Sequence, residues 1–270
     1  MRRFVRFSSV LSLKDILYLI AIAMTGATAG YGQAPPLVTD RPGFTDSAVA
    51  VPKGAVQLEG GIGLETDHAS DTHDWFWGTP LLRIGLGHNL EARVDSDGVI
   101  TDRVHRIGET GIGDASAGFK YQLMHDAGRR PDLAVTFEVE LPTGSSAFRE
   151  DSVTPSFKLA WAKDVSHGFA ASGNFDWASI GNATGRIRQL AVTLGLDRDL
   201  GRGFGAFVEA FGIGENHGGG VAYFAATGLT HGIGANAQWD CSVTRRLTQQ
   251  GPDWAIGGGL VFRHLPARHH

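Results

Sequence analysis

The sequence predicts an all-β protein, a transmembrane antiparallel up-and-down β-barrel of about twelve strands. Three observations favour this fold class. Apolar and polar residues alternate with a period of two along most of the chain, as in strands with one apolar and one polar face. The first 29 residues have the pattern of an export signal. Beyond them no apolar run reaches 18 residues, so membrane-spanning helices are not expected.

The prediction starts from the alternation at residues 82–98. Two alternating runs flank a His88-Asn89 turn, as expected of a β-hairpin. One face of this hairpin is apolar, and the other carries the charged side chains Arg83, Glu91, Arg93 and Asp95. In a soluble β-sandwich the apolar face would meet a protein core. In an outer-membrane barrel it would meet lipid, and the charged face would meet a water-filled interior.

Residues 1–29 are interpreted as a signal peptide. A basic start with Arg2 and Arg3 is followed by the apolar run 16–24 and small residues up to Ala29, after which we expect cleavage. The alternative is an uncleaved anchoring helix. The net charge of the whole chain is -4, and residues 1–29 carry four bases and one acid (+3), so the remainder carries -4 - 3 = -7. This acidity gives little electrostatic support for nucleic-acid binding.

Residues 30–54 are rich in proline and turn-forming residues, so we expect an extended N-terminal segment that leads into the first strand. The barrel is predicted over residues 55–262, and 263–270 form a C-terminal tail. Connections near residues 88, 163–168, 197–201 and 231–232 are mostly short, whereas those near 67–74, 99–108, 142–152 and 215–220 are mostly longer. Short periplasmic turns and longer outer loops would produce this alternation.

Twelve strands are expected, at about residues 56–65, 75–87, 90–98, 113–123, 133–141, 156–161, 172–177, 189–196, 204–214, 222–230, 237–243 and 254–262. The facing is unclear in two of them. Phe207 and Phe211 share the parity of Glu209, which predicts either a bulge or an aromatic side chain inside the barrel. The strand at 222–230 is ambiguous.

The composition of the polar face favours the barrel over the sandwich, which remains the alternative. It has only four bases, Arg83, Arg93, Lys120 and Lys158, against ten acids: Glu59, Glu65, Glu91, Asp95, Asp114, Glu138, Glu140, Asp176, Glu209 and Asp240. Twelve strands with one apolar face each have no helix to cover that face. Closure into a barrel pairs the backbone groups of the edge strands and leaves the apolar face to lipid. Six tryptophans lie near strand ends or on apolar faces, as in interfacial girdles: Trp75, Trp77, Trp161, Trp177, Trp239 and Trp254.

Several stretches also match a known family. Residues 39–46 (TDRPGFTD), with 51–54 (VPKG) and 56–61 (VQLEGG), resemble the opening of the outer-membrane transporter family named for the meta-pathway of phenol degradation. Later similarities are 90–94 (LEARV), 111–114 (GIGD), 120–123 (KYQL) and 141–144 (LPTG). The resemblance implies an outer-membrane barrel with a transport role linked to aromatic compounds. One departure is the end, because such barrels commonly finish on an aromatic residue and here eight residues follow Phe262.

Enzymatic and metal chemistry find little support. The sequence has no G-x-S-x-G elbow, P-loop or zinc-type cysteine pair, so no cofactor is expected. No Ser-His-acid set lies on the apolar face, so an outer-membrane phospholipase is only an alternative. The glycine runs 201–205 and 257–259 are interpreted as strand glycines. His68 and His73 with neighbouring aspartates are interpreted as solvated loop residues rather than metal ligands.

The predicted function is passage of small solutes, aromatic compounds among them, across the bacterial outer membrane by passive or facilitated diffusion. The candidate solute path is lined by Arg83, Glu91, Arg93, Asp95, Lys120, Glu138, Glu140 and Lys158. Two arrangements of these residues are possible. Either the excess of acids leaves an open acidic path, or the four bases Arg83, Arg93, Lys120 and Lys158 pair with the carboxylates and close the lumen. Asp40, Arg41 and Pro42 form a second candidate motif, in which Arg41 reaches an inward carboxylate and tethers the N-terminal segment. The expected partners are membrane lipid and a small solute. The alternative function is a non-conducting structural or binding barrel whose outer loops contact a partner.

Overall fold

The computed structural model describes residues 35–105, 107–125, 130–182, 185–216 and 220–267. Within these ranges the chain forms strands and no helix, and none of it has the helical length and hydropathy needed to cross a membrane. The strands are β1 (Val56–Asp67), β2 (Thr72–Gly87), β3 (Leu90–Ser96), β4 (Val99–Val104), β5 (Ile107–Ile112), β6 (Ala115–Met124), β7 (Asp132–Leu141), β8 (Thr154–Ser166), β9 (Phe169–Asn182), β10 (Gly185–Gly201), β11 (Phe204–Glu215), β12 (Val221–Gly232), β13 (Ala237–Arg246) and β14 (Trp254–His264).

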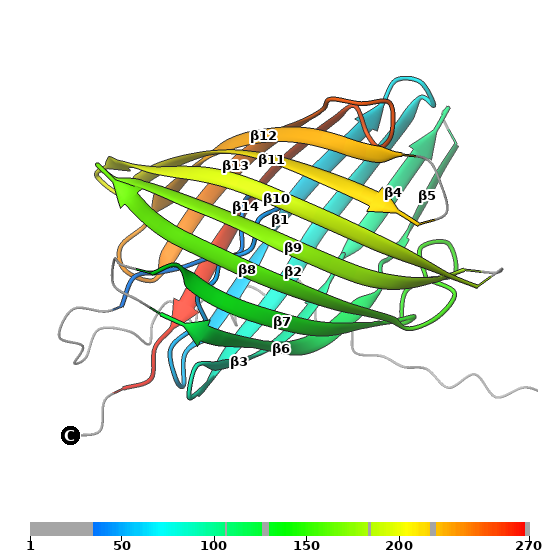
Figure 1. Ribbon diagram of the computed structural model, residues 1–270. Helices are drawn as coiled ribbons and strands as arrows, with labels where there is room; N and C mark the ends of the chain where they lie inside the picture. Colours follow the sequence, from blue (N-terminus) through cyan, green and yellow to red (C-terminus); the bar gives the residue numbers. More distant parts are fainter. Residues whose placement is uncertain (1–34, 106, 126–129, 183–184, 217–219, 268–270) are drawn as a thin grey trace, which may run out of the picture.

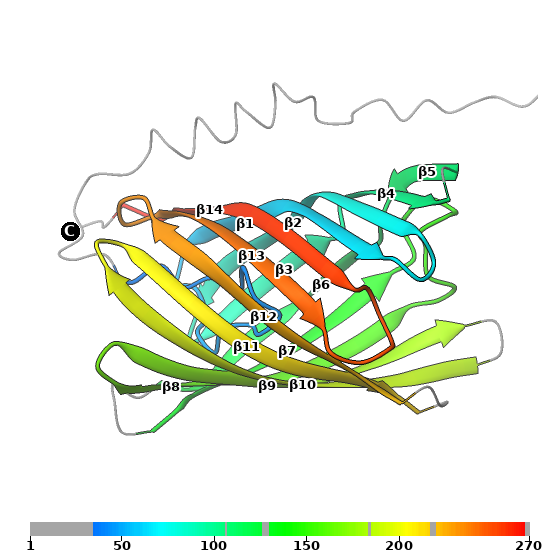
Figure 2. The same ribbon diagram turned by 90° about the horizontal axis from the view of Figure 1, so that it is seen from above.

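The strands close into an antiparallel barrel, seen from two directions in Figures 1 and 2. Each barrel strand pairs with the strands before and after it in the chain, except that β3 pairs with β6, and β1 completes the ring by pairing with both β14 and β2. Twelve strands make the ring, in agreement with the sequence prediction. A closed ring leaves no edge strand among these twelve, which is the arrangement that satisfies the backbone in a membrane.

The predicted loop at residues 99–108 is wrong, because this stretch forms the extra hairpin β4–β5. Strand β2 is 16 residues long and pairs with β3 only over Leu81–Gly87. Its other half, Thr72–Trp77, pairs with β4. The β-branched residues at the start of β4 suit a strand, and the pairing satisfies backbone groups of β2 that would otherwise have no partner.

The alternation has the facing of a membrane barrel. On β10 the side chains of Leu190, Val192 and Leu194 are 46%, 57% and 60% exposed, whereas Ala191 and Thr193 between them are 5% and 3% exposed. On the inside, Arg83, Glu91 and Lys120 are fully buried, as expected of a polar interior. Apolar residues are therefore outside and ions inside, the reverse of a soluble sandwich, so the sandwich alternative is wrong.

The two ends of the barrel differ. One end, here called the turn end, has tight connections such as His88-Asn89, where both residues have positive φ as a type I′ turn requires. Both ends of the barrel sequence, Val56 and His264, lie there as paired residues of β1 and β14. The opposite, loop end has the 12-residue connection 142–153 between β7 and β8.

Residues 35–55 do not run outside the barrel but enter its turn end (Figure 2). This segment has no strand of its own. We call residues 38–52 the plug, because side chains and backbone groups of this stretch contact inward-facing residues of the barrel wall. The predicted signal peptide, residues 1–29, lies outside the described residues.

Candidate functional site in the barrel lumen

Asp40 is the centre of the contacts between the plug and the wall. Its carboxylate lies 2.9 Å from Lys120 Nζ, 2.6 Å from Arg93 Nη1 and 3.5 Å from Arg83 Nη1. Burial alone would raise the pKa of this carboxyl, but Arg83, Lys120 and Arg93 outweigh burial and hold the pKa well below its usual range. Asp40 also accepts hydrogen bonds from the backbone and hydroxyl of Ser47, so it orders the plug itself.

The wall supplies matching carboxylates around these bases. Arg83 donates to Glu91 at 2.8 Å and to Glu59 at 2.9 Å. The same two carboxylates accept backbone N–H groups of the plug, from Asp40 to Glu59 at 3.1 Å and from Val51 to Glu91 at 2.9 Å. Adjacent strands of the wall therefore carry both acids and bases, and groups of the plug form the remaining hydrogen bonds and ion pairs of these side chains.

Arg41 of the plug reaches across the lumen to Asp240 on β13, with Nη2 and Oδ1 3.1 Å apart. Its guanidinium lies against Gly61 of β1 and Gly259 of β14, where a Cβ atom would collide with it. These inward-facing glycines therefore make room for Arg41. Pro42, the next residue of the candidate motif, follows a cis peptide bond.

The rest of the plug contacts the opposite wall. Asp46 pairs with Lys158 at 2.7 Å. Glu209 on β11 accepts the backbone N–H groups of Phe44 at 2.7 Å and Thr45 at 3.1 Å. The Phe44 ring stacks on Phe211 with centroids 4.4 Å apart. Because the pairing of β11 shows no bulge around Phe211, the aromatic side chain inside the barrel is the correct one of the two sequence interpretations.

Beyond the plug, an acidic cavity of about 470 Å³ opens between β3, β6, β7 and β8. Five acids of its wall make no ion pair with any base among the described residues: Asp95, Asp97, Asp114, Glu140 and Glu150. Burial and its acidic neighbours raise the pKa of Asp97 in the connection after β3, and burial together with Asp114 raises that of Glu150 in the 142–153 loop. The lining of the cavity therefore holds more carboxyl groups than bases, and burial and mutual repulsion oppose the ionisation of Asp97 and Glu150.

A second, mainly aromatic cavity of about 480 Å³ lies against β1, β11, β12 and β14, and the carboxylate of Glu65 on β1 also lines it. Phe44, Phe76, Phe211 and Phe224 line it, together with small residues such as Gly257. Phe211 and Phe224 stack at 5.0 Å between centroids, so the three rings of Phe44, Phe211 and Phe224 form one continuous aromatic surface. The lumen thus has an acidic side and an aromatic side.

The eight residues of the predicted solute path fall into two groups. The acidic cavity is lined by five of them: Arg93, Asp95, Glu138, Glu140 and Lys158. Arg83, Glu91 and Lys120 are fully buried beneath the plug, so they are not on an open path in this conformation. The plug contacts of Asp46, Glu209 and the phenylalanine stack were not predicted. The sequence offered one signal for them: Phe207 and Phe211 lie on the same face of their strand as Glu209.

The described part of the chain holds no group of three His, Cys, Asp or Glu side chains arranged for a metal ion. In the loops, His68 Nδ1 instead lies 3.0 Å from Asp253.

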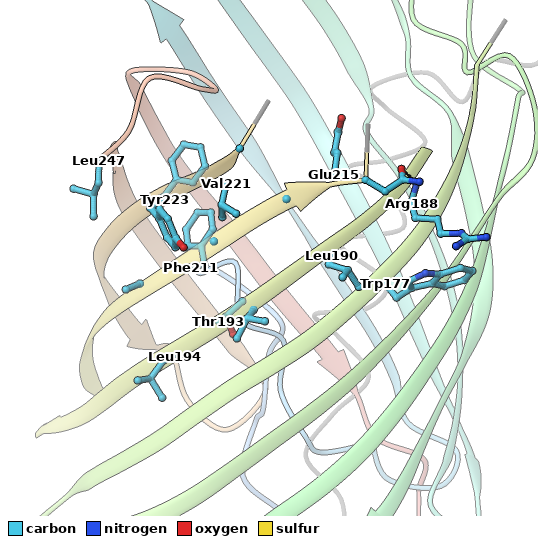
Figure 3. A pocket seen from close by; sticks show the side chains of 17 residues that line it. Trp177, Arg188, Leu190, Thr193, Leu194, Phe211, Glu215, Val221, Tyr223 and Leu247 are labelled. Atoms are coloured by element: carbon cyan, nitrogen blue, oxygen red, sulfur yellow. Dashed lines mark hydrogen bonds between the residues drawn. The ribbon is translucent and has the colours of Figure 1, made fainter. Parts of the chain in front are cut away.

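A surface hollow of about 890 Å³ lies on the outer face of the wall (Figure 3). The small outward residues Ala210, Gly212 and Gly214 of β11 form it, between Leu190 on β10 and Tyr223 on β12. Phe211 and Phe224 reach its floor from the inside. Because its walls are outward-facing apolar residues, this groove belongs to the lipid-facing surface rather than to the lumen.

The family model described as "Putative MetA-pathway of phenol degradation" matches residues 39–264. The chain belongs to this family. The match begins inside the plug and ends with β14, so the plug is part of the unit that defines the family. The search of curated proteins finds no match.

Solved structures share the fold at low sequence identity. An outer membrane channel from Pseudomonas putida F1 has a TM-score of 0.61 at 14% identity, with 83% of this chain and 99% of that chain covered. The NanC porin has a TM-score of 0.53 at 9% identity, and the KdgM porin 0.51 at 10% identity; each comparison covers 77% of this chain and 98% of the other. Together with the apolar exterior and ionic interior, the family and fold identify a β-barrel of the bacterial outer membrane.

Proposed function

We propose that this barrel passes small solutes, aromatic compounds among them, through the outer membrane, and that the plug controls the passage. The observation that carries the proposal is the division of the lumen into solvent-accessible cavities on the loop side and a plug held by ion pairs on the turn side. With the turn end in the periplasm, solutes enter from the outside and cross when the plug loosens. The solved structures of similar fold are an outer membrane channel and two porins.

The acidic cavity supports a preference for cations. Five carboxylates without a basic partner create a negative potential that raises the local concentration of cations and lowers that of anions. Glu138 and Glu140 lie two residues apart on β7 and both line this cavity. Glu138 is paired with Arg93 at 2.8 Å, whereas Glu140 has no such base.

Planar-bilayer recording tests this preference. We expect cation-selective current, and we expect Glu138→Gln with Glu140→Gln to reduce the selectivity, because two charges are removed while side-chain size is kept. Asp199→Asn, at the turn end on an exposed side chain, is the matched control. An anion preference of the wild-type protein, or selectivity unchanged by the double substitution, would contradict the proposal.

The second candidate function is a non-conducting structural or binding barrel. The full burial of Arg83, Glu91 and Lys120 under the plug favours it, because the lumen is filled at that level. Liposome swelling with sugars and with monoaromatic solutes separates the two functions. Swelling by the wild-type protein or by a variant with a weakened plug supports passage, and no swelling by either supports the structural barrel.

We propose no catalytic activity for this chain. The solved structures of similar fold, a channel and two porins, support a transport role over a catalytic one.

A further inference from the structure

The acidic and aromatic cavities meet. Arg41 and Thr79 line both of them, so the two spaces adjoin at the surface of the plug. The positive charge of Arg41 is balanced by Asp240, 3.1 Å away, so Arg41 does not repel a cation strongly. A solute that enters from the loop end therefore finds carboxylates on one side and phenyl rings on the other.

The acidic side offers more than a surplus of charge. Thr154, at the start of β8, is only 6% exposed, and its hydroxyl has no hydrogen-bond partner among the described residues although it lines the cavity. A buried hydroxyl without a partner carries a free-energy penalty that a polar ligand would remove. The carboxylates are not gathered for a metal ion, so the space of about 470 Å³ suits a larger, organic cation.

The aromatic side presents flat apolar surface. Phe44 and Phe211 stack at 4.4 Å and Phe211 and Phe224 at 5.0 Å, and Phe76 adds a fourth ring to the wall. Small inward residues opposite them leave this surface open. Such a stack binds planar apolar groups by burial and by offset stacking, and it tolerates a nearby ammonium group by cation–π attraction.

We propose that the two cavities form one binding site for protonated aromatic amines. The aromatic ring of the ligand lies against Phe44, Phe211 and Phe224, and its ammonium group faces Asp95 and Glu140. This inference rests on the proposed function, since it names the class of solute that the lumen retains. Neutral aromatic alcohols use only the phenyl surface, and aliphatic amines use only the carboxylates.

Calorimetry on the full protein in detergent tests the site with matched probes. The probes are 2-phenylethylamine, the neutral 2-phenylethanol and the non-aromatic butylamine. We expect the aromatic amine to bind about tenfold more tightly than either of the others at low salt. We expect this advantage to shrink in about 1 M salt, because screening weakens the attraction to the carboxylates.

Variants test the two parts of the site, the carboxylates and the phenyl rings, separately. Asp95→Asn with Glu140→Gln should reduce the advantage of 2-phenylethylamine over 2-phenylethanol, because two of the unpaired carboxylates are removed, and should leave the binding of 2-phenylethanol unchanged. Phe224→Leu should weaken both aromatic probes, and Asp199→Asn should change neither. Equal binding of amine and alcohol to the wild-type protein, which needs no variant, would overturn the inference, as would an advantage that the double carboxylate substitution leaves unchanged.

The failure of this inference and that of the proposed function give different results. Swelling of liposomes by neutral solutes with no preference for the amine in calorimetry overturns only the binding site. A preference for the amine in calorimetry without swelling by any variant supports the site and overturns passage.

Discussion

Replacing Asp40 by alanine should open the barrel. Lys120 Nζ is fully buried, and Asp40 is the only carboxylate within ion-pair distance of it among the described residues. After the substitution Lys120 retains only the backbone oxygen of Ser47 at 3.0 Å. The plug loses its central anchor while the barrel wall keeps its own ion pairs between Arg83 and two glutamates.

Removing one partner of a buried ion pair costs about 3–5 kcal/mol, and this sets the expected loss of stability of the docked plug. We take the lower value of about 3 kcal/mol, because water can reach Lys120 once the plug leaves. At about 1.4 kcal/mol per factor of ten, the ratio of docked to undocked plug should fall by roughly a hundredfold. A plug that is closed nearly all the time would then be open for a measurable fraction of it.

Single-channel recording measures this fraction, and limited proteolysis of the N-terminal segment provides a second readout. The double variant Asp40→Ala with Lys120→Met should recover part of the closed state, because it removes the unpaired buried charge together with its partner. Asp199→Asn again serves as the control. Wild-type conductance together with wild-type protease resistance in Asp40→Ala would refute the role of this ion pair in holding the plug.

Two further predictions concern the same plug. Gly259→Val should displace the guanidinium of Arg41 and raise conductance as much as Arg41→Ala does; a barrel that stays as closed as the wild type would argue against this contact. Because the pKa of Asp40 is lowered in the folded state, its ion pairs stabilise the docked plug fully above the unfolded pKa of about 3.9 and lose this effect as the pH falls through the lower folded value. Conductance measured in steps from about pH 5 to about pH 2 should therefore rise in the wild type, and Asp40→Asn should lack this part of the rise.

The fold could be predicted from the sequence because lipid and water impose opposite demands on alternate residues of a strand. Residues 133–141 alternate without interruption, and the structure forms β7 over Asp132–Leu141. The extra hairpin was missed because the residues of β4 and β5 lie beyond the membrane-facing belt, where no solvent boundary enforces alternation. Ile107, which is 83% exposed, shows how weak this constraint is there.

The candidate site was predictable only in part. The charged residues of the wall follow from strand parity, and so does their inward direction. Their partners do not, because the plug contacts join residues far apart in sequence through a segment without periodicity. Nothing in the alternation of β6 indicates that Lys120 meets Asp40, 80 residues earlier, or that Asp95 and Glu140 remain without a base.

The contact between Arg41 and Asp240 spans 199 residues, so it joins the plug to the penultimate strand of the barrel. The plug is made first at the ribosome, yet its binding surface exists only after β13 has entered the membrane. The complete docking surface of the plug therefore forms only when β13 has joined the barrel, so the contact between Arg41 and Asp240 is made late in assembly.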